Sequence, residues 1–203
     1  GMALAPLPRG DAAPGTPARG IVRREIRDTT QAHIVFGTDT FPYADSRRYA
    51  LAMLINAFGG GMSSRLFQRI REDLGLAYAV YAYHQFYRSA GQSGVYVGTQ
   101  PGTAAQATEA ILAEYQRMSS EGLSPDEIDD ARRQLKGQVM LGLESPQSRM
   151  NRLATLSLQG EAYRPLDRVL EEIDAVGADT LAAVAQEFFA PERQTIVRLG
   201  PKS

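Results

Sequence analysis

Residues 58–78 read FGGGMSSRLFQRIREDLGLAY, and this stretch decides how the middle of the chain folds. Gly59, Gly60 and Gly61 can end one helix and let the backbone turn closely into the next, where side chains would obstruct it. Ser63 and Ser64 can cap that second helix. Its apolar stripe consists of Leu66, Phe67, Ile70 and Leu74. Gly75 then ends the helix where a left-handed residue is needed.

The sequence before this stretch predicts two strands and a helix. Residues 21–28 and 31–38 carry β-branched and aromatic residues between turn formers, which is typical of strands. Asp45 is a plausible N-cap for a helix that reaches Phe58.

The sequence after the stretch predicts a hairpin, several helices and a last strand. Residues 77–88 and 91–99 indicate a β-hairpin, and Ser124 and Glu127 form a capping box that opens a long helix through Leu143. The remaining elements are helices at about 103–120 and after residues 146, 165 and 177, and a strand at 194–200. The order predicts an α+β fold with an antiparallel-rich sheet and helices packed on one face.

Composition limits the organisation and the classes of function. The first 20 residues are rich in Pro, Gly and Ala without apolar periodicity, so we expect a flexible tail or inter-domain linker at 1–20 and one domain at 21–203. The apolar runs of that tail are too short for a signal peptide, and no stretch of the chain has the roughly 20 apolar residues of a membrane span. A net charge of −1 argues against a nucleic-acid partner. We expect a soluble protein. Its compartment, cytoplasmic or periplasmic, stays open because a chain without cysteine is compatible with either redox setting.

Several common sites are missing from the sequence. The two histidines, His33 and His84, are far apart, so no helical zinc pair exists and we expect no metal site in this chain. The glycine run at 59–61 lacks the lysine and spacing of a phosphate-binding loop. Ser63 and Ser64 lack the flanking pattern of a nucleophile elbow.

Arg71 and Tyr78 are the candidate functional residues. Arg71 falls at the margin of the apolar stripe, and Tyr78 begins the strand after the turn at Gly75, so a chain reversal can bring two hydrogen-bond donors to one place. A structural role is the alternative, with Arg71 paired to Glu72 or Asp73 on the surface and Tyr78 as a satisfied tyrosine.

Residues 59–83, GGGMSSRLFQRIREDLGLAYAVYAY, resemble the signature of the second, zinc-free domain of the pitrilysin and mitochondrial processing peptidase family of inverted-zincin metallopeptidases. The resemblance extends over nearly all of residues 22–200. In such peptidases two similar α+β domains face each other. The first carries His-x-x-Glu-His and a distal Glu, and the second supplies an arginine and a tyrosine with six residues between them. That pair matches Arg71 and Tyr78, and the zinc-bearing domain is absent from this chain.

The resemblance implies the substrate-binding half of a zinc endopeptidase that hydrolyses peptides or unfolded segments, inactive by itself. Zinc is expected in the partner domain or subunit, and Arg71 and Tyr78 are expected to bind substrate carbonyls and support the transition state. Two alternatives stay open: a non-catalytic scaffold subunit and a free-standing peptide-binding module of the same fold. A His-x-x-Glu-His motif encoded about one domain length upstream, or in a neighbouring reading frame, would separate the endopeptidase interpretation from these two alternatives.

Overall fold

The computed structural model describes residues 19–201, and these residues form one five-stranded sheet with helices. The strand order is β1-β5-β2-β4-β3, with β1 at Val22–Ile26, β2 at Ala32–Thr40, β3 at Ala79–Phe86, β4 at Gly91–Thr99 and β5 at Thr195–Gly200. Only β1 and β5 pair in parallel; the other neighbours are antiparallel. The predicted α+β class with an antiparallel-rich sheet is therefore confirmed.

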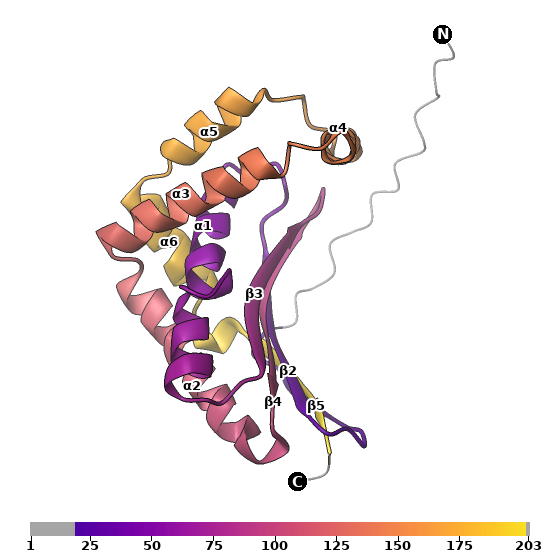
Figure 1. Ribbon diagram of the computed structural model, residues 1–203, viewed down its shortest axis with the longest axis vertical. Helices are drawn as coiled ribbons and strands as arrows, with labels where there is room; N and C mark the ends of the chain where they lie inside the picture. Colours follow the sequence, from indigo (N-terminus) through magenta and orange to yellow (C-terminus); the bar gives the residue numbers. More distant parts are fainter. Residues whose placement is uncertain (1–18, 202–203) are drawn as a thin grey trace.

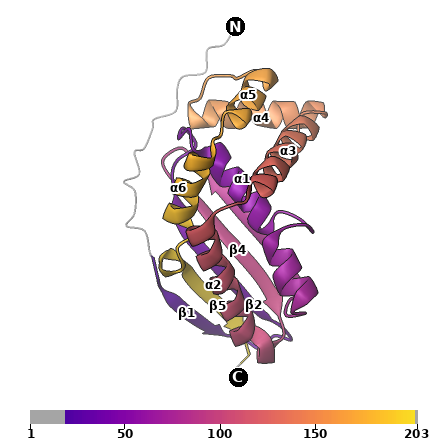
Figure 2. The same cartoon turned by 90° about the vertical axis from the view of Figure 1, so that its left-hand side faces the viewer.

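The helices lie mainly on one face of the sheet (Figures 1 and 2). Their bounds are α1 Arg48–Gly59, α2 Ala104–Glu121, α3 Pro125–Leu141, α4 Pro146–Gln159, α5 Leu166–Asp174 and α6 Ala178–Phe188. Short 3₁₀ turns, η2 Pro101–Thr103 and η3 Pro191–Arg193, precede α2 and β5. α1, α2 and α6 pack together, and α3 and α5 pack beyond α1. None of the helices within 19–201 is long and apolar enough to cross a membrane.

The core lies between the sheet and the helices because β2 alternates strictly. Ala32, Ile34 and Phe36 face the helices and are fully buried, whereas the residues between them are partly exposed. Phe58 at the end of α1 and Phe189 after α6 meet edge to face at a ring separation of 5.1 Å. Burial of this face fixes the register of β2, since a shift by one residue would expose the whole apolar set.

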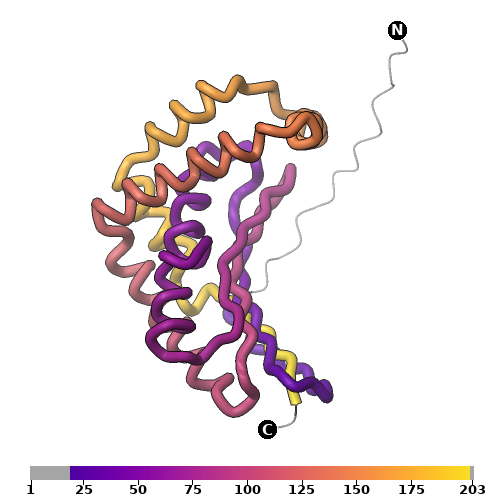
Figure 3. The backbone as a smooth tube through the Cα atoms, viewed as in Figure 1, coloured from indigo at the N-terminus to yellow at the C-terminus, as the bar shows by residue number. Residues whose placement is uncertain are grey.

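α4 stands apart from the main helical layer. It lies near the tip of the β3–β4 hairpin, as the backbone tube shows (Figure 3). Gln159 at its end contacts the backbone oxygen of Phe86 at 3.5 Å, and Leu156 is the single α4 residue classed as buried. Met150, Leu153 and Leu158 on the same helix are exposed.

Two predicted boundaries differ from the structure. Asp45 does not cap α1: its Oδ1 accepts a hydrogen bond from the Arg47 backbone at 2.8 Å, in a turn that precedes a helix starting at Arg48. The long helix predicted to reach Leu143 ends at Leu141 instead. The Ser124–Glu127 capping box is present as predicted.

The division of the chain at residue 20 stays a prediction. Residues 1–18 of the predicted tail lie outside the described residues. Arg19 makes a bidentate ion pair with Asp39 of β2, with N–O distances of 2.7 and 2.6 Å. The Arg19 hydrogen bonds hold the pKa of the Asp39 carboxyl below its usual value.

Candidate functional site

The segment that carries Arg71 is a π-helix, η1, at Phe67–Asp73. Its hydrogen bonds run from residue i to i+5, as shown by the bond of 3.2 Å from the Leu74 amide to the Arg69 oxygen. The expected regular α-helix is therefore wrong here, although Leu66 and Ile70 are fully buried as the stripe predicts. π-helical turns are rare and occur frequently at functional sites.

The expected serine cap is also absent from this segment. The Ser64 hydroxyl donates to the Gly61 oxygen at 2.5 Å, and no side chain caps the start of η1. Arg65, just before the π-helix, holds this end of the segment through its hydrogen bonds to Glu127.

Arg71 points its guanidinium over the ring of Phe67, at 4.9 Å from the ring centre. Its side chain is 47% exposed, and its charged partner Glu72 lies at 3.9 Å, beyond hydrogen-bond distance. Asp73, the other partner considered from the sequence, instead faces Arg69 at 3.6 Å. Most of the Arg71 donors therefore have no acceptor within the described part of the chain.

Tyr78 lies just before β3, and its backbone amide donates to the Gly98 oxygen at 2.9 Å. This bond fixes the main chain of Tyr78 to the sheet while the side chain is 53% exposed. Its hydroxyl has no hydrogen-bond partner among residues 19–201. η1 packs beside β3, so Arg71 lies on the element next to the strand that Tyr78 precedes, and no hydrogen bond joins the two side chains within the described residues.

The four glycines of this region differ in what they require. A Cβ on Gly59 would lie 2.5 Å from the Ala82 nitrogen, and one on Gly60 would lie 2.7 Å from the Asn56 Cα, so both positions are tight. A Cβ on Gly61 would meet only Gln134, at 3.7 Å, which is an ordinary contact. Gly75 has φ +59°, the left-handed conformation that favours glycine at a helix end.

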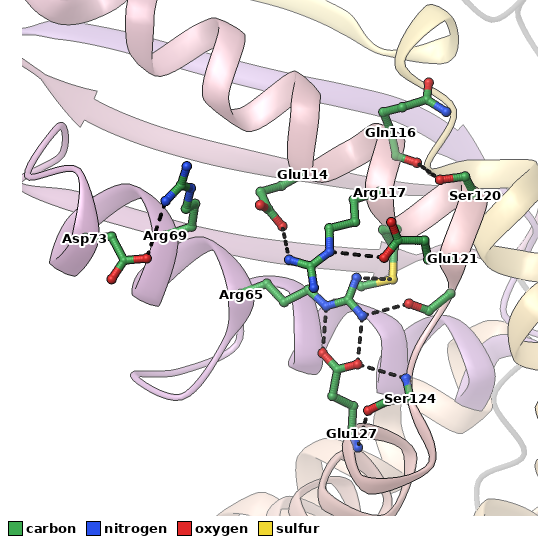
Figure 4. A network of polar contacts seen from close by, with 12 residues as sticks. Arg65, Arg69, Asp73, Glu114, Gln116, Arg117, Ser120, Glu121, Ser124 and Glu127 are labelled. Carbon is green, nitrogen blue, oxygen red and sulfur yellow. Dashed lines mark hydrogen bonds and ion pairs between the residues drawn. The ribbon is translucent and has the colours of Figure 1, made fainter.

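Arg65 fixes the start of η1 to the start of α3 (Figure 4). Its Nε and Nη2 donate to the two carboxylate oxygens of Glu127 at 2.6 and 2.7 Å, and Nη2 also donates to the Gly122 oxygen at 2.7 Å. Glu127 accepts a further bond from the Ser124 amide at 2.8 Å. The Arg65 hydrogen bonds lower the pKa of Glu127 from 4.5 to about 2. The spacing of Ser124 and Glu127 predicted the capping box. It gave no indication of the Arg65–Glu127 pair, because 62 residues separate these two side chains in the sequence.

The face of the sheet opposite the helices carries an aromatic cluster that sequence reasoning did not assign. In the strand register Tyr81 of β3 lies opposite Tyr96 of β4, and their ring centres are 5.1 Å apart. Tyr96 shares a hydrogen bond of 2.8 Å with His33 of β2, and Tyr83 lies 6.4 Å from Tyr81. The alternation of tyrosines at 81 and 83 was the available signal, since residues two apart share a face of a strand.

The described residues do not fit a zinc site. No group of three His, Cys, Asp or Glu side chains within 19–201 is arranged to hold a metal. His33 is engaged with Tyr96 on one face of the sheet, whereas His84 lies among helix residues on the other. Burial lowers the pKa of His84. No catalytic step through zinc is therefore assigned to this part of the chain.

Sequence and structure comparisons agree on one family. The model for the peptidase M16 inactive domain matches residues 4–135, a range that includes Arg71 and Tyr78 and begins inside the predicted tail. An uncharacterised zinc protease of Streptomyces coelicolor is 38% identical over 184 residues, which are 91% of this chain and 40% of the relative. The chain thus spans about two fifths of the length of the curated relatives it matches.

Two solved structures share the fold. The peptidase M16 inactive domain from Pseudomonas fluorescens superposes with a TM-score of 0.84 at 18% identity, covering 97% of this chain and 48% of that one. Complex III2 from Candida albicans contains a chain that superposes with a TM-score of 0.77 at 17% identity, covering 89% and 45%. Identities this low show the fold alone. Together with the family match, they confirm the resemblance found in residues 59–83: the chain belongs to the peptidase M16 inactive domain family.

Proposed function

We propose that this chain is the substrate-binding half of a zinc metalloendopeptidase, working with a zinc-bearing His-x-x-Glu-His domain in the same polypeptide or in a separate subunit. The observation that carries the proposal is that Arg71, on η1, and Tyr78, just before β3, present exposed donors with little structural use. Arg71 has one charged neighbour at 3.9 Å, and the Tyr78 hydroxyl has no partner within the described residues. Substrates are peptides or unfolded segments that lie extended along a sheet edge between the two halves.

In this proposal the residues of this chain bind and orient the peptide. The planar guanidinium of Arg71 can donate two parallel hydrogen bonds, and the phenol of Tyr78 donates one. Aimed at carbonyl oxygens near the scissile bond, these donors position the peptide and stabilise negative charge as it develops. A zinc ion bound in the partner domain supplies an activated water.

The local supports of the two residues favour a fixed geometry. η1 is anchored at its start by the Arg65–Glu127 pair, and the left-handed Gly75 turns the chain two residues after its end. The main chain of Tyr78 is bonded to β4. Donors held by a rigid scaffold lose less conformational entropy when substrate binds.

The open aromatic face of the sheet supports a partner or peptide on that side. Tyr81 and Val197 are exposed on this face, and Tyr96 lies between their strands. Tyrosine is enriched at binding interfaces because it combines apolar area with a hydrogen-bonding end.

The scaffold alternative has the likeness to complex III2 in its favour, since that complex contains the same fold. A scaffold does not need exposed, unpartnered donors at positions 71 and 78. The free-standing peptide-binding module differs from the leading proposal only in lacking a zinc-bearing half. A complementary domain that carries His-x-x-Glu-His, found upstream or in a neighbouring frame, separates both from the leading proposal.

The test compares variants of this chain assembled with its zinc-bearing half, on an unfolded substrate such as casein. Arg71→Ala and Tyr78→Phe should each lower kcat/KM, by about 10²–10³ if the lost donor stabilises an oxyanion, or mainly through KM if it only positions the peptide. Arg71→Lys should recover little, because a point charge does not reproduce the planar fork. The matched controls are Arg69→Ala, on the same π-helix and facing Asp73, and Tyr87→Phe, an exposed tyrosine at the hairpin tip.

Both controls should keep wild-type kinetics, and all variants should bind zinc and melt as the wild type does. Because the Arg71 and Tyr78 side chains are about half exposed, their loss should change folding stability by less than about 0.5 kcal/mol. Normal kcat/KM in the folded Arg71→Ala, Tyr78→Phe double variant would refute the catalytic proposal.

A further inference from the structure

A cavity of about 330 Å³ lies on the helical side of the molecule, apart from Arg71 and Tyr78. Residues of α1, the end of β3, α3, α4 and α5 line it, and it is open to solvent. Its volume is at the lower end of the range of about 300–1,000 Å³ that is usual for small-molecule sites. The proposed peptidase function gives this cavity no role.

Part of the cavity lining is aliphatic. Leu135 and Val139 of α3, Leu156 of α4 and Val169 of α5 line it, with the ring of Phe86 at the end of β3. The rings of Tyr43, Tyr49 and His84 also belong to the lining, so a flexible alkyl chain could pack against both aliphatic and aromatic surface there. Each methylene group of a ligand moved from water into such surroundings strengthens binding by about fourfold.

The polar side of the cavity is cationic. Arg48, Arg152 and Arg164 line it, and no Asp or Glu does. Arg48 is buried and has partners within the protein: it donates to the Tyr43 oxygen at 3.1 Å and to the Tyr49 hydroxyl at 3.0 Å. Its ion pair with Glu172, which lies outside the cavity lining, is 3.3 Å long.

Arg152 and Arg164 keep donors that the protein does not use. Nη2 of Arg152 donates to the Arg164 backbone oxygen at 2.7 Å, while its Nε and Nη1 have no hydrogen-bond acceptor within 19–201. Nη2 of Arg164 donates to Glu161 at 2.7 Å, and its Nη1 is 3.9 Å from Glu172. His84, also in the lining, has no hydrogen-bond partner in the described part of the chain.

The cavity therefore combines unused donors with an aliphatic wall and lacks an acidic acceptor of its own. Burying a cationic side chain costs free energy unless an anion or a strong hydrogen-bond acceptor pairs with it. We propose that this cavity binds a small carboxylate with an aliphatic tail, its head group held by Arg152 beside His84 and its tail against Leu156 and Val169.

The test titrates the complete chain with sodium octanoate at pH 7 and follows the methyl resonances of Leu156 and Val169 by NMR. Saturable shifts of these methyls are expected. Octylamine, with the same tail and a positive head, and acetate, with the same head and no tail, should each bind at least tenfold more weakly. Equal binding of octanoate and octylamine, or shifts confined to the Tyr81–Tyr96 face, would overturn the proposal.

Variants locate the head group. Arg152→Met should weaken octanoate binding about tenfold or more, which is about 1.4 kcal/mol. His84→Phe, which keeps a ring and removes the ring nitrogens, should weaken it severalfold. The matched control Arg168→Met removes an exposed arginine of α5 outside the cavity lining and should leave binding unchanged.

If Arg152→Met and His84→Phe both fold, judged by circular dichroism and melting, and both bind octanoate as the wild type does, the site assignment is wrong. Octanoate binding should also be unaffected by Arg71→Ala. The octanoate titration therefore tests the cavity independently of the proposed peptidase function.

Discussion

Replacing Glu127 by Gln tests how firmly the π-helix is anchored to α3. The substitution removes a carboxylate that accepts two hydrogen bonds from Arg65 and one from the Ser124 amide. A pKa lowered from 4.5 to about 2 corresponds to about 3.4 kcal/mol at 1.36 kcal/mol per pKa unit. Because the Glu127 side chain is 33% exposed, solvent screening reduces this to about 1–2 kcal/mol of folding stability at neutral pH.

The pH dependence has a definite sign. The folded-state pKa of Glu127 lies below the unfolded value, so its stabilisation is fully present above about pH 4.5 and is lost as the pH falls toward 2. The stability gap between wild type and Glu127→Gln should therefore be constant from pH 7 to about 5 and shrink by roughly half at pH 3.

The assay is urea denaturation at pH 7, 4.5 and 3, followed by circular dichroism. Asp130→Asn is the control, because Asp130 pairs with Arg133 on the surface of the same helix, and both side chains are well exposed. That pair should contribute below about 1 kcal/mol. If Glu127→Gln destabilises no more than Asp130→Asn at pH 7, or if the gap does not narrow at pH 3, the Arg65–Glu127 anchor is not a stabilising feature.

Three further predictions concern the glycines and the metal. Gly75→Ala should destabilise by about 1–2 kcal/mol from backbone strain alone, since φ is +59° and the space around a Cβ is open; Gly137→Ala, inside α3 in equally open space, should not destabilise, as thermal melting can show. Gly59→Ala should cost about 1–3 kcal/mol because its Cβ meets the Ala82 backbone, whereas Gly61→Ala should be close to neutral in the same denaturation assay. The isolated chain should retain well below one zinc per molecule after dialysis against a mild chelator, measured by atomic emission, and one tightly bound zinc would contradict this.

The parts of the fold that were predictable depend on local sequence chemistry. The left-handed Gly75 and the Ser124–Glu127 capping box each follow from residues within one or two turns of each other. The β3–β4 hairpin likewise followed from two strand-like runs joined by a short turn. Signals of this kind are visible because the interacting groups are close in sequence.

The π-helix was not predictable from the same evidence. Leu66, Phe67, Ile70 and Leu74 fit a regular helical stripe, and what distinguishes the π-helix is the shift of backbone hydrogen bonds to i+5. Composition carries no sign of that shift. The predicted start of α1 was wrong for another local reason. The Asp45 carboxylate accepts a hydrogen bond from the Arg47 amide in a turn before the helix, and this bond competes with helix capping.

Long-range pairs were also beyond the sequence. The bond between Arg65 and Glu127 spans 62 residues, and the Tyr96–His33 contact spans 63. Sequence reasoning could place Arg71 and Tyr78 through the family resemblance, but it could not show how many of their donors the fold already uses. That information comes only from the surroundings of each side chain.

Three arginines of one short segment separate architecture from proposed function. Arg65 is 10% exposed and donates to Glu127 and Gly122, so its role is to hold the segment in place. Arg69 faces Asp73 at 3.6 Å on the surface, a pair whose expected contribution is close to zero. Arg71 lacks buried partners like those of Arg65: its contacts are the surface ion pair with Glu72 at 3.9 Å and the ring of Phe67. Loss of Arg65 should therefore lower stability, loss of Arg69 should change little, and loss of Arg71 should appear only when substrate is present.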